Sequence, residues 1–152
     1  MAKTPQIYYI TTDLDLVASR DLAPLAAALA EKRVFALSVT AHTDGRWYAT
    51  LENDCDADRE RGSEPEKEIV TMLDAVDSLR GVARSIWSKC ILREFNIGYE
   101  CGDEPWAFNN GLTNATLRRM AKVGATLKIT IYSVHPPVRK VSPKKKRKAP
   151  RR

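Results

Sequence analysis

Five stretches of the chain have the residue pattern of β-strands. Residues 7–12 are rich in β-branched and aromatic side chains, and the later stretches alternate apolar with polar residues, which predicts strands that bury one face. The five predicted strands are residues 7–12, 34–40, 46–52, 91–101 and 127–131. In the last two, the apolar residues predicted to face the core are Phe95, Ile97, Tyr99 and Cys101, then Leu127, Ile129 and Ile131.

Three other segments repeat apolar residues every three or four positions, which predicts amphipathic helices. The longest is predicted to be unbroken, because Ser63 and Glu66 form a capping box and an apolar stripe then continues to Cys90. The predicted helices are residues 22–29, residues 63–90 and a short segment around residues 117–121 that ends at Gly124.

The dipeptide Asp44-Gly45 marks a hairpin between the second and third predicted strands. A two-residue loop would place the apolar residues of the two strands on opposite faces. Matching of the apolar faces therefore favours a three-residue loop, with Gly45 in the left-handed conformation. This loop would pair residue 41 with 47, residue 39 with 49 and residue 37 with 51.

The predicted order of elements is β-α-β-β-α-β-α-β, which defines an α+β protein. Strands with a single apolar face favour a two-layer sandwich, because a doubly wound sheet needs strands that are apolar on both faces. We expect a five-stranded, mostly antiparallel sheet with three helices on one face and a largely solvated opposite face. Residues 1–138 are predicted to form this single domain.

The net charge of +6 is an average over two parts of unlike composition. Residues 139–152 carry nine Lys or Arg and no acid, which leaves 16 basic and 19 acidic residues in the rest of the chain. Charge repulsion and prolines predict that residues 139–152 form a disordered basic tail. The tail would bind phosphates without sequence preference, act as a targeting signal or keep the protein soluble, and the sequence leaves these roles open. Its candidate phosphate-binding residues are Lys144, Lys145, Lys146, Arg147, Lys148, Arg151 and Arg152.

The chain lacks the familiar sequence motifs of catalysis, namely a glycine-rich phosphate loop, a Gly-x-Ser-x-Gly elbow and a His-Glu-x-x-His pair. His42 and His135 stand apart and no Cys-x-x-Cys spacing occurs, so we expect neither a metal nor another cofactor. Cys90 and Cys101 occupy predicted apolar positions and are expected to be buried thiols. An enzyme of unrecognised type stays open as an alternative, and its candidate residues are Asp13, Asp15, Glu100 and Cys101.

Every uncharged run, residues 22–30 and 34–43 among them, is shorter than the roughly 18 residues that a membrane span needs. Residues 1–5 show no apolar signal core. We therefore expect a cytoplasmic protein that does not bind membranes.

Residues 102–113 combine large aromatic side chains, carboxylates and amides between the fourth strand and the last helix. Tryptophan is a favoured anchor in protein interfaces, so this loop is the candidate partner-binding segment. The competing interpretation is that Trp106 and Phe108 fold back onto the sheet edge. The candidate partner-binding residues are Asp103, Glu104, Trp106, Phe108, Asn109 and Asn110. Asp13, Asp15 and Glu100 are expected to line a groove between this loop and the loop after the first strand.

The second half of the chain contains four characteristic segments: residues 92–99 (LREFNIGY), 110–113 (NGLT), 117–121 (LRRMA) and 124–132 (GATLKITIY). Together they resemble the bacterial domain-of-unknown-function family 4279, a family of small, uncharacterised α+β proteins. The resemblance covers about residues 68–132. It implies a binding protein more than an enzyme, because the family has no established catalytic residues and some members look like immunity or accessory proteins of bacterial competition systems. The basic tail departs from the family pattern.

Three function hypotheses follow. The first is a non-catalytic bacterial interaction protein, of the immunity or accessory type, that binds an unidentified protein partner through the 102–113 loop and the open sheet face. The second is an accessory protein that binds nucleic acid weakly and nonspecifically through its tail. The third is an enzyme of unrecognised type. The oligomeric state is left open.

Overall fold

The structure is a computed structural model of the chain, and it describes residues 4–54 and 64–134. The predicted tail at residues 139–152, with its candidate phosphate-binding residues, lies outside the described residues. Ser63, which the capping box requires, and His135 also lie outside them.

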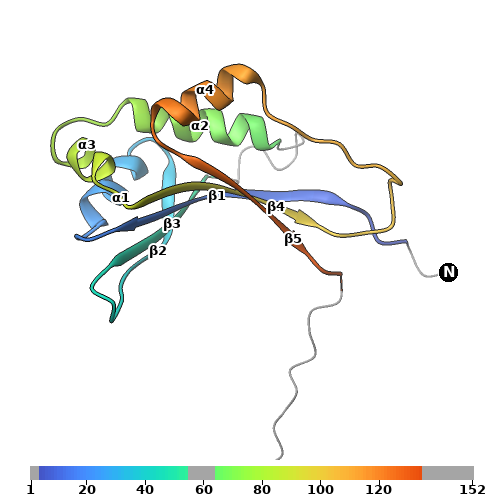
Figure 1. Cartoon of the computed structure of the whole chain (residues 1–152), viewed down its shortest axis with the longest axis horizontal. Helices are drawn as coiled ribbons and strands as arrows, with labels where there is room; N and C mark the ends of the chain where they lie inside the picture. The colour runs from blue at the N-terminus through green and yellow to red at the C-terminus, as the bar shows by residue number, and fades with distance from the viewer. Residues whose placement is uncertain (1–3, 55–63, 135–152) are drawn as a thin grey trace, which may run out of the picture.

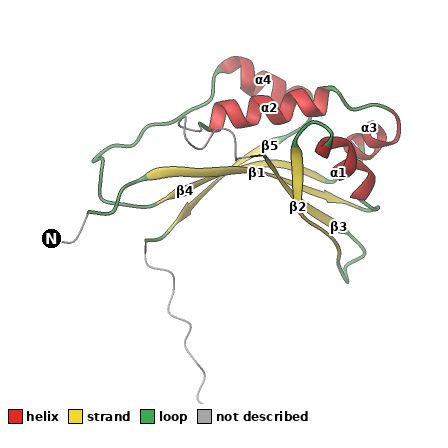
Figure 2. Ribbon diagram, turned by 180° about the vertical axis from the view of Figure 1, so that it is seen from behind, coloured by secondary structure: helices red, strands yellow, loops and turns green. Residues whose placement is uncertain are grey.

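The described part of the chain contains five strands and four helices in two layers. Figures 1 and 2 show that these helices gather on one face of the sheet and leave the opposite face open. The fold is therefore α+β, as predicted. In chain order the elements are β1 (Tyr8–Ala18), α1 (Ala23–Ala30), β2 (Val34–Ala41), β3 (Trp47–Asn53), α2 (Pro65–Asp77), α3 (Gly81–Ser88), β4 (Leu92–Glu100), α4 (Asn114–Lys122) and β5 (Thr126–Tyr132).

The sheet has the strand order β2-β3-β1-β4-β5, with β1 at its centre. β1 pairs antiparallel with both β3 and β4, and β2 pairs antiparallel with β3. β5 runs parallel to β4, because the chain crosses over the sheet through α4 before it returns. The mostly antiparallel sheet is thus confirmed, and β2 and β5 form its edges.

The core lies between the sheet and the helices and depends on the alternation of residues along β1. Leu14, Leu16 and Ala18 are buried beneath the helices, and the residues between them face the open side of the sheet. Phe95 of β4 lies opposite Leu14 and is fully buried. β1 is longer than predicted, because its alternation continues to Ala18.

The prediction of one helix from Ser63 to Cys90 is wrong, since two helices, α2 and α3, occupy this region. The break begins at Ser78, whose backbone N–H and hydroxyl both donate to the carbonyl of Ala75. Gly81 then adopts a φ of +55°, a conformation that side-chain-bearing residues in helices avoid. The observed order is therefore β-α-β-β-α-α-β-α-β.

The predicted hairpin is confirmed at its turn and wrong further along β2. Gly45 has a φ of +76°, and the two residue pairs predicted next to the loop form as expected. Beyond them a β-bulge places Ala36, instead of Leu37, opposite Leu51. Leu37 is exposed, as are most residues of this edge strand, so the predicted apolar face of β2 is not continuously buried.

Gly81→Ala is expected to lower the free energy of unfolding by about 1 kcal/mol, because alanine resists the positive φ at the junction of α2 and α3. Gly111→Ala is the matched control: open space surrounds both glycines, but the φ of Gly111 is not positive. Urea denaturation of the two variants gives the comparison, and we expect Gly111→Ala to be neutral. A gain in stability for Gly81→Ala would show that α2 and α3 fuse without cost.

Candidate functional site

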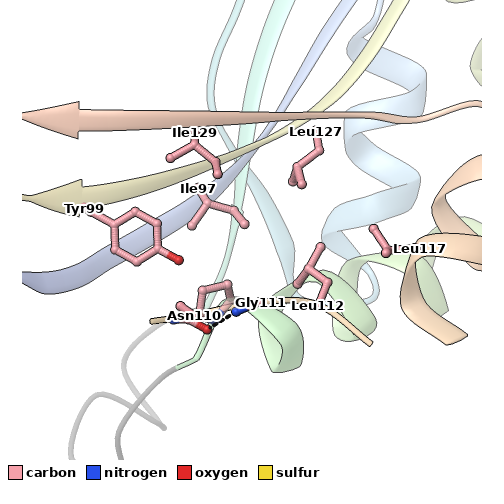
Figure 3. A pocket seen from close by; sticks show the side chains of 9 residues that line it. Ile97, Tyr99, Asn110, Gly111, Leu112, Leu117, Leu127 and Ile129 are labelled. Carbon is pink, nitrogen blue, oxygen red and sulfur yellow. Dashed lines mark hydrogen bonds between the residues drawn. The ribbon is translucent and has the colours of Figure 1, made fainter. Parts of the chain in front are cut away.

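An apolar pocket of about 200 Å³ lies on the helix-bearing face of the sheet, beside the edge strand β5. Figure 3 shows side chains of β4 and β5 converging on it, with α4 and the 102–113 loop opposite them. The lining residues are Pro65, Ile97, Tyr99, Asn110, Gly111, Leu112, Leu117, Leu127 and Ile129. We call this pocket, together with the exposed residue Ile131 on the same face of β5, the β5 groove.

The floor of the β5 groove is more exposed than the sheet beside it. Leu127 lies opposite Phe95 and Ile129 opposite Ile97, so each pair belongs to one row of the same sheet face. Phe95 and Ile97 are 0% and 3% exposed, whereas Leu127, Ile129 and Ile131 are 41%, 59% and 67% exposed. The helices therefore cover β4 and leave β5 uncovered. The predicted orientation of these β5 residues is confirmed, but they do not lie in the core.

The 102–113 loop is held at its start by the N-terminal segment. The backbone N–H groups of Asp103 and Glu104 donate to the carbonyl of Pro5, at 2.9 and 3.3 Å. Gly102 permits this close approach, because a Cβ there would lie 2.5 Å from a backbone atom of the N-terminal segment. Two of the candidate partner-binding residues, Asp103 and Glu104, thus lie where the loop is fixed.

The loop is held at its end by Glu66 of α2. The Glu66 carboxylate accepts hydrogen bonds from the N–H of Thr113 at 2.9 Å, from the Thr113 hydroxyl at 2.7 Å and from the Thr116 hydroxyl. Burial raises the pKa of Glu66, but the hydrogen bonds from Thr116 and Thr113 outweigh it and hold the pKa below its ordinary value. Thr113 also caps α4, since its hydroxyl accepts a hydrogen bond from the N–H of Thr116. Ionised Glu66 therefore links α2 to the end of the loop.

Trp106 and Phe108, which lie two residues apart in the loop, have different environments. The Phe108 ring packs edge to face against Tyr99 with 5.5 Å between ring centroids, as the competing interpretation expects. The Trp106 side chain is 98% exposed, so the fold-back interpretation is wrong for this residue. Asn109 is exposed, and Asn110 lines the pocket. The loop thus presents an indole to solvent four residues before Asn110 of the pocket.

Asp13, Asp15 and Glu100 do not form a groove with this loop. β1 runs through Asp13 and Asp15, so the expectation that they lie in a loop is wrong. They alternate with buried residues and face the open side of the sheet, opposite Asn96 and Glu94 of β4. Glu100 ends β4 on that same open side, whereas the pocket lies on the helix-bearing side.

Asp13 has an unusual electrostatic environment. Burial is the largest cause of a pKa raised to about 6, and the negative charges of Asp15, Glu52 and Glu68 add to it. The buried Oδ1 of Asp13 has no hydrogen-bond partner in the described part of the chain. The ionised form of Asp13 is therefore disfavoured in the folded state.

The two cysteines in the described residues differ in burial. Cys90 is buried, and its thiol donates to the carbonyl of Ile86 at 3.4 Å. Burial raises the pKa of Cys90, which makes this thiol unreactive. The prediction that Cys101 is buried is wrong, because β4 ends at Glu100 and Cys101 follows it at the surface. Within residues 4–54 and 64–134 no group of three or more His, Cys, Asp or Glu is placed to hold a metal ion.

No family model, no curated protein and no solved structure matches this chain. The resemblance to domain-of-unknown-function family 4279 therefore stays a prediction. None of the helices described here is long and apolar enough to span a bilayer.

Leu117, Leu127 and Ile129 belong to predicted apolar faces, so the sequence pattern indicates core positions for them and not binding residues. Alternation along a strand, or a stripe along a helix, shows which way a side chain points. It does not show whether another element covers that face, and the edge position of β5 has no signature in the local sequence. The exposure of these residues, 45% for Leu117, is what singles them out.

Asp13→Asn is expected to flatten the dependence of stability on pH. Between its unfolded pKa of 3.8 and its folded pKa of about 6, the folded state binds more protons, so wild-type stability falls as the pH rises through this window. We expect the free energy of unfolding of the variant to exceed that of the wild type by about 1 kcal/mol at pH 7. Partial exposure of Asp13 to solvent keeps the difference this small. Urea denaturation from pH 4 to pH 8 measures the effect, with the exposed Glu31→Gln as control. A wild-type slope retained by Asp13→Asn would contradict this.

Proposed function

We propose that this chain is a non-catalytic protein-binding module of the immunity or accessory type, and that Trp106 and the β5 groove form its binding surface. The observation that carries the proposal is the exposure of the apolar residues of β5, on the same face and in the same rows as the buried core of β4. Contiguous exposed apolar surface of this kind is typical of interaction sites.

The size and shape of the β5 groove favour a protein ligand. Small-molecule sites usually enclose about 300–1,000 Å³ and surround most of the ligand. The pocket here holds about 200 Å³, and its apolar floor continues past it to Ile131 along an open edge. Such a site suits one large side chain of a partner, with flanking residues packed along β5.

The edge of the sheet adds a second mode of contact. β5 pairs with β4 on one side only, so the other side presents backbone N–H and C=O groups to an approaching chain. Known peptide-binding proteins add a strand to such an edge and select it through pockets for alternate side chains. Leu127, Ile129 and Ile131 occupy alternate positions of this kind.

The resemblance to domain-of-unknown-function family 4279 supports the same class of function, and with it a bacterial, cytoplasmic protein. The nine Lys and Arg of residues 139–152 favour a second candidate function, weak nonspecific binding of nucleic acid. The two functions depend on different parts of the chain, so deletion of residues 139–152 separates them.

Ile131→Lys is expected to abolish capture of the partner from native lysate, because a lysine there places a charge on the apolar strip. Val82→Lys is a matched control, since Val82 is 69% exposed and Ile131 67% exposed, and Val82 lies in α3, outside the surface. Trp106→Ala should lower affinity for the same partner at least about 30-fold, as a buried aromatic anchor does. Affinity capture with mass spectrometry gives the readout, after circular dichroism confirms that each variant is folded.

Nuclease treatment and the tail deletion should leave this capture unchanged. If the captured material is lost on nuclease treatment or on deletion of residues 139–152, the result would support nucleic-acid binding instead. Equal capture by wild type, Ile131→Lys and Trp106→Ala would reject the proposed surface.

A further inference from the structure

We infer that a second copy of this chain binds the proposed surface, in a two-fold dimer in which Trp106 of each copy inserts into the β5 groove of the other. The inference rests on the proposed function, since it uses the same surface and names one occupant of it. The basis is that the same surface carries an exposed aromatic side chain, Trp106, and an apolar pocket, the β5 groove.

The chain limits the distance between Trp106 and the groove. Asn110 and Gly111, four and five residues after Trp106, line the pocket, so the connecting chain spans at most about 18 Å. A two-fold axis that passes between Trp106 and the β5 groove places Trp106 of each copy at the groove of the other. Two chains then satisfy both contacts, so assembly stops at a dimer.

The groove has the right size and chemistry for an indole. A cavity of about 150 Å³ holds a benzene ring, and the pocket here is about 200 Å³ with mostly apolar walls. Asn110 and Tyr99, which line the pocket, supply polar groups for the indole N–H. Within the described part of the chain the Trp106 side chain is 98% exposed, so the indole is available to another copy.

The exposed apolar area matches a dimer of moderate affinity. Trp106, Leu117, Leu127, Ile129 and Ile131 are 98%, 45%, 41%, 59% and 67% exposed. Their burial would remove roughly 600 Å² per copy, or about 1,200 Å² in the pair, which is the lower end of the range for specific interfaces. We therefore expect association in the micromolar range.

Sedimentation velocity of the full chain from about 1 to 200 μM tests the inference, because this range brackets micromolar affinity. We expect the mass to rise from one chain to two. Trp106→Ala and Ile129→Lys should each weaken association at least about 30-fold, and Val82→Lys should not. Acrylamide quenching of tryptophan fluorescence should fall as the dimer forms, because Trp87 is buried and Trp106 is the most exposed indole of the described residues.

Mixing the two weakened variants tests whether the contact is reciprocal. In the mixed pair, Trp106 of the Ile129→Lys copy meets the intact groove of the Trp106→Ala copy, so one complete contact is restored. The mixture should therefore associate more tightly than either variant alone. A mixture no tighter than the single variants, or a dimer unaffected by Trp106→Ala, would overturn the inference.

The outcomes also separate this inference from the proposed function. A chain that stays monomeric at every concentration overturns the dimer, while partner capture that depends on Ile131 and Trp106 would still support the binding module. A reciprocal dimer whose surface variants leave partner capture unchanged supports the inference and rejects the proposed function. Protection of Trp106 from quenching without any change in mass would place the indole in its own groove and overturn the inference.

Discussion

The attachment of α4 to α2 is the interaction on which the candidate surface depends. Glu66 of α2 accepts hydrogen bonds from the first residues of α4 and its cap, and Arg119 donates to Asp74 and Asp77 at 2.7 and 2.9 Å. An exposed ion pair contributes only about 0–1 kcal/mol, but buried Met120 adds apolar contact along the same side of the helix. α4 is thus held beside α2 and does not extend over β5.

The parallel pairing of β4 and β5 makes this placement consequential. A parallel pair needs a crossover, and the crossover helix is the element that ordinarily covers the returning strand. Because α4 is held toward α2, none of the described helices covers the apolar face of the edge strand β5. Full burial of an aliphatic side chain contributes about 1.5–3 kcal/mol, so half-exposed residues such as Ile129 retain part of this free energy for a binding partner.

The sequence predicted the fold class and most element positions, because alternation and helical periodicity are local properties. It failed where the outcome depended on a single backbone conformation or on distant contacts. The positive φ of Gly81 divides a helix whose apolar stripe is continuous, and a bulge in β2 places Ala36 instead of Leu37 opposite Leu51. The candidate loop was identified from composition, yet only the packing of Phe108 on Tyr99 shows which of its two aromatics is free.

The way in which the loop is held explains why it is suited to binding. Ordering a loop or a long side chain on association costs free energy, and a segment already fixed in the free protein avoids most of that cost. Gly102 allows the start of the loop to pack against the N-terminal segment, Phe108 fixes its middle on the sheet, and Glu66 holds its end. Trp106 lies between fixed points, so its burial by a partner orders little more than one rigid ring. Little of the binding free energy of the indole is therefore lost to ordering of the loop.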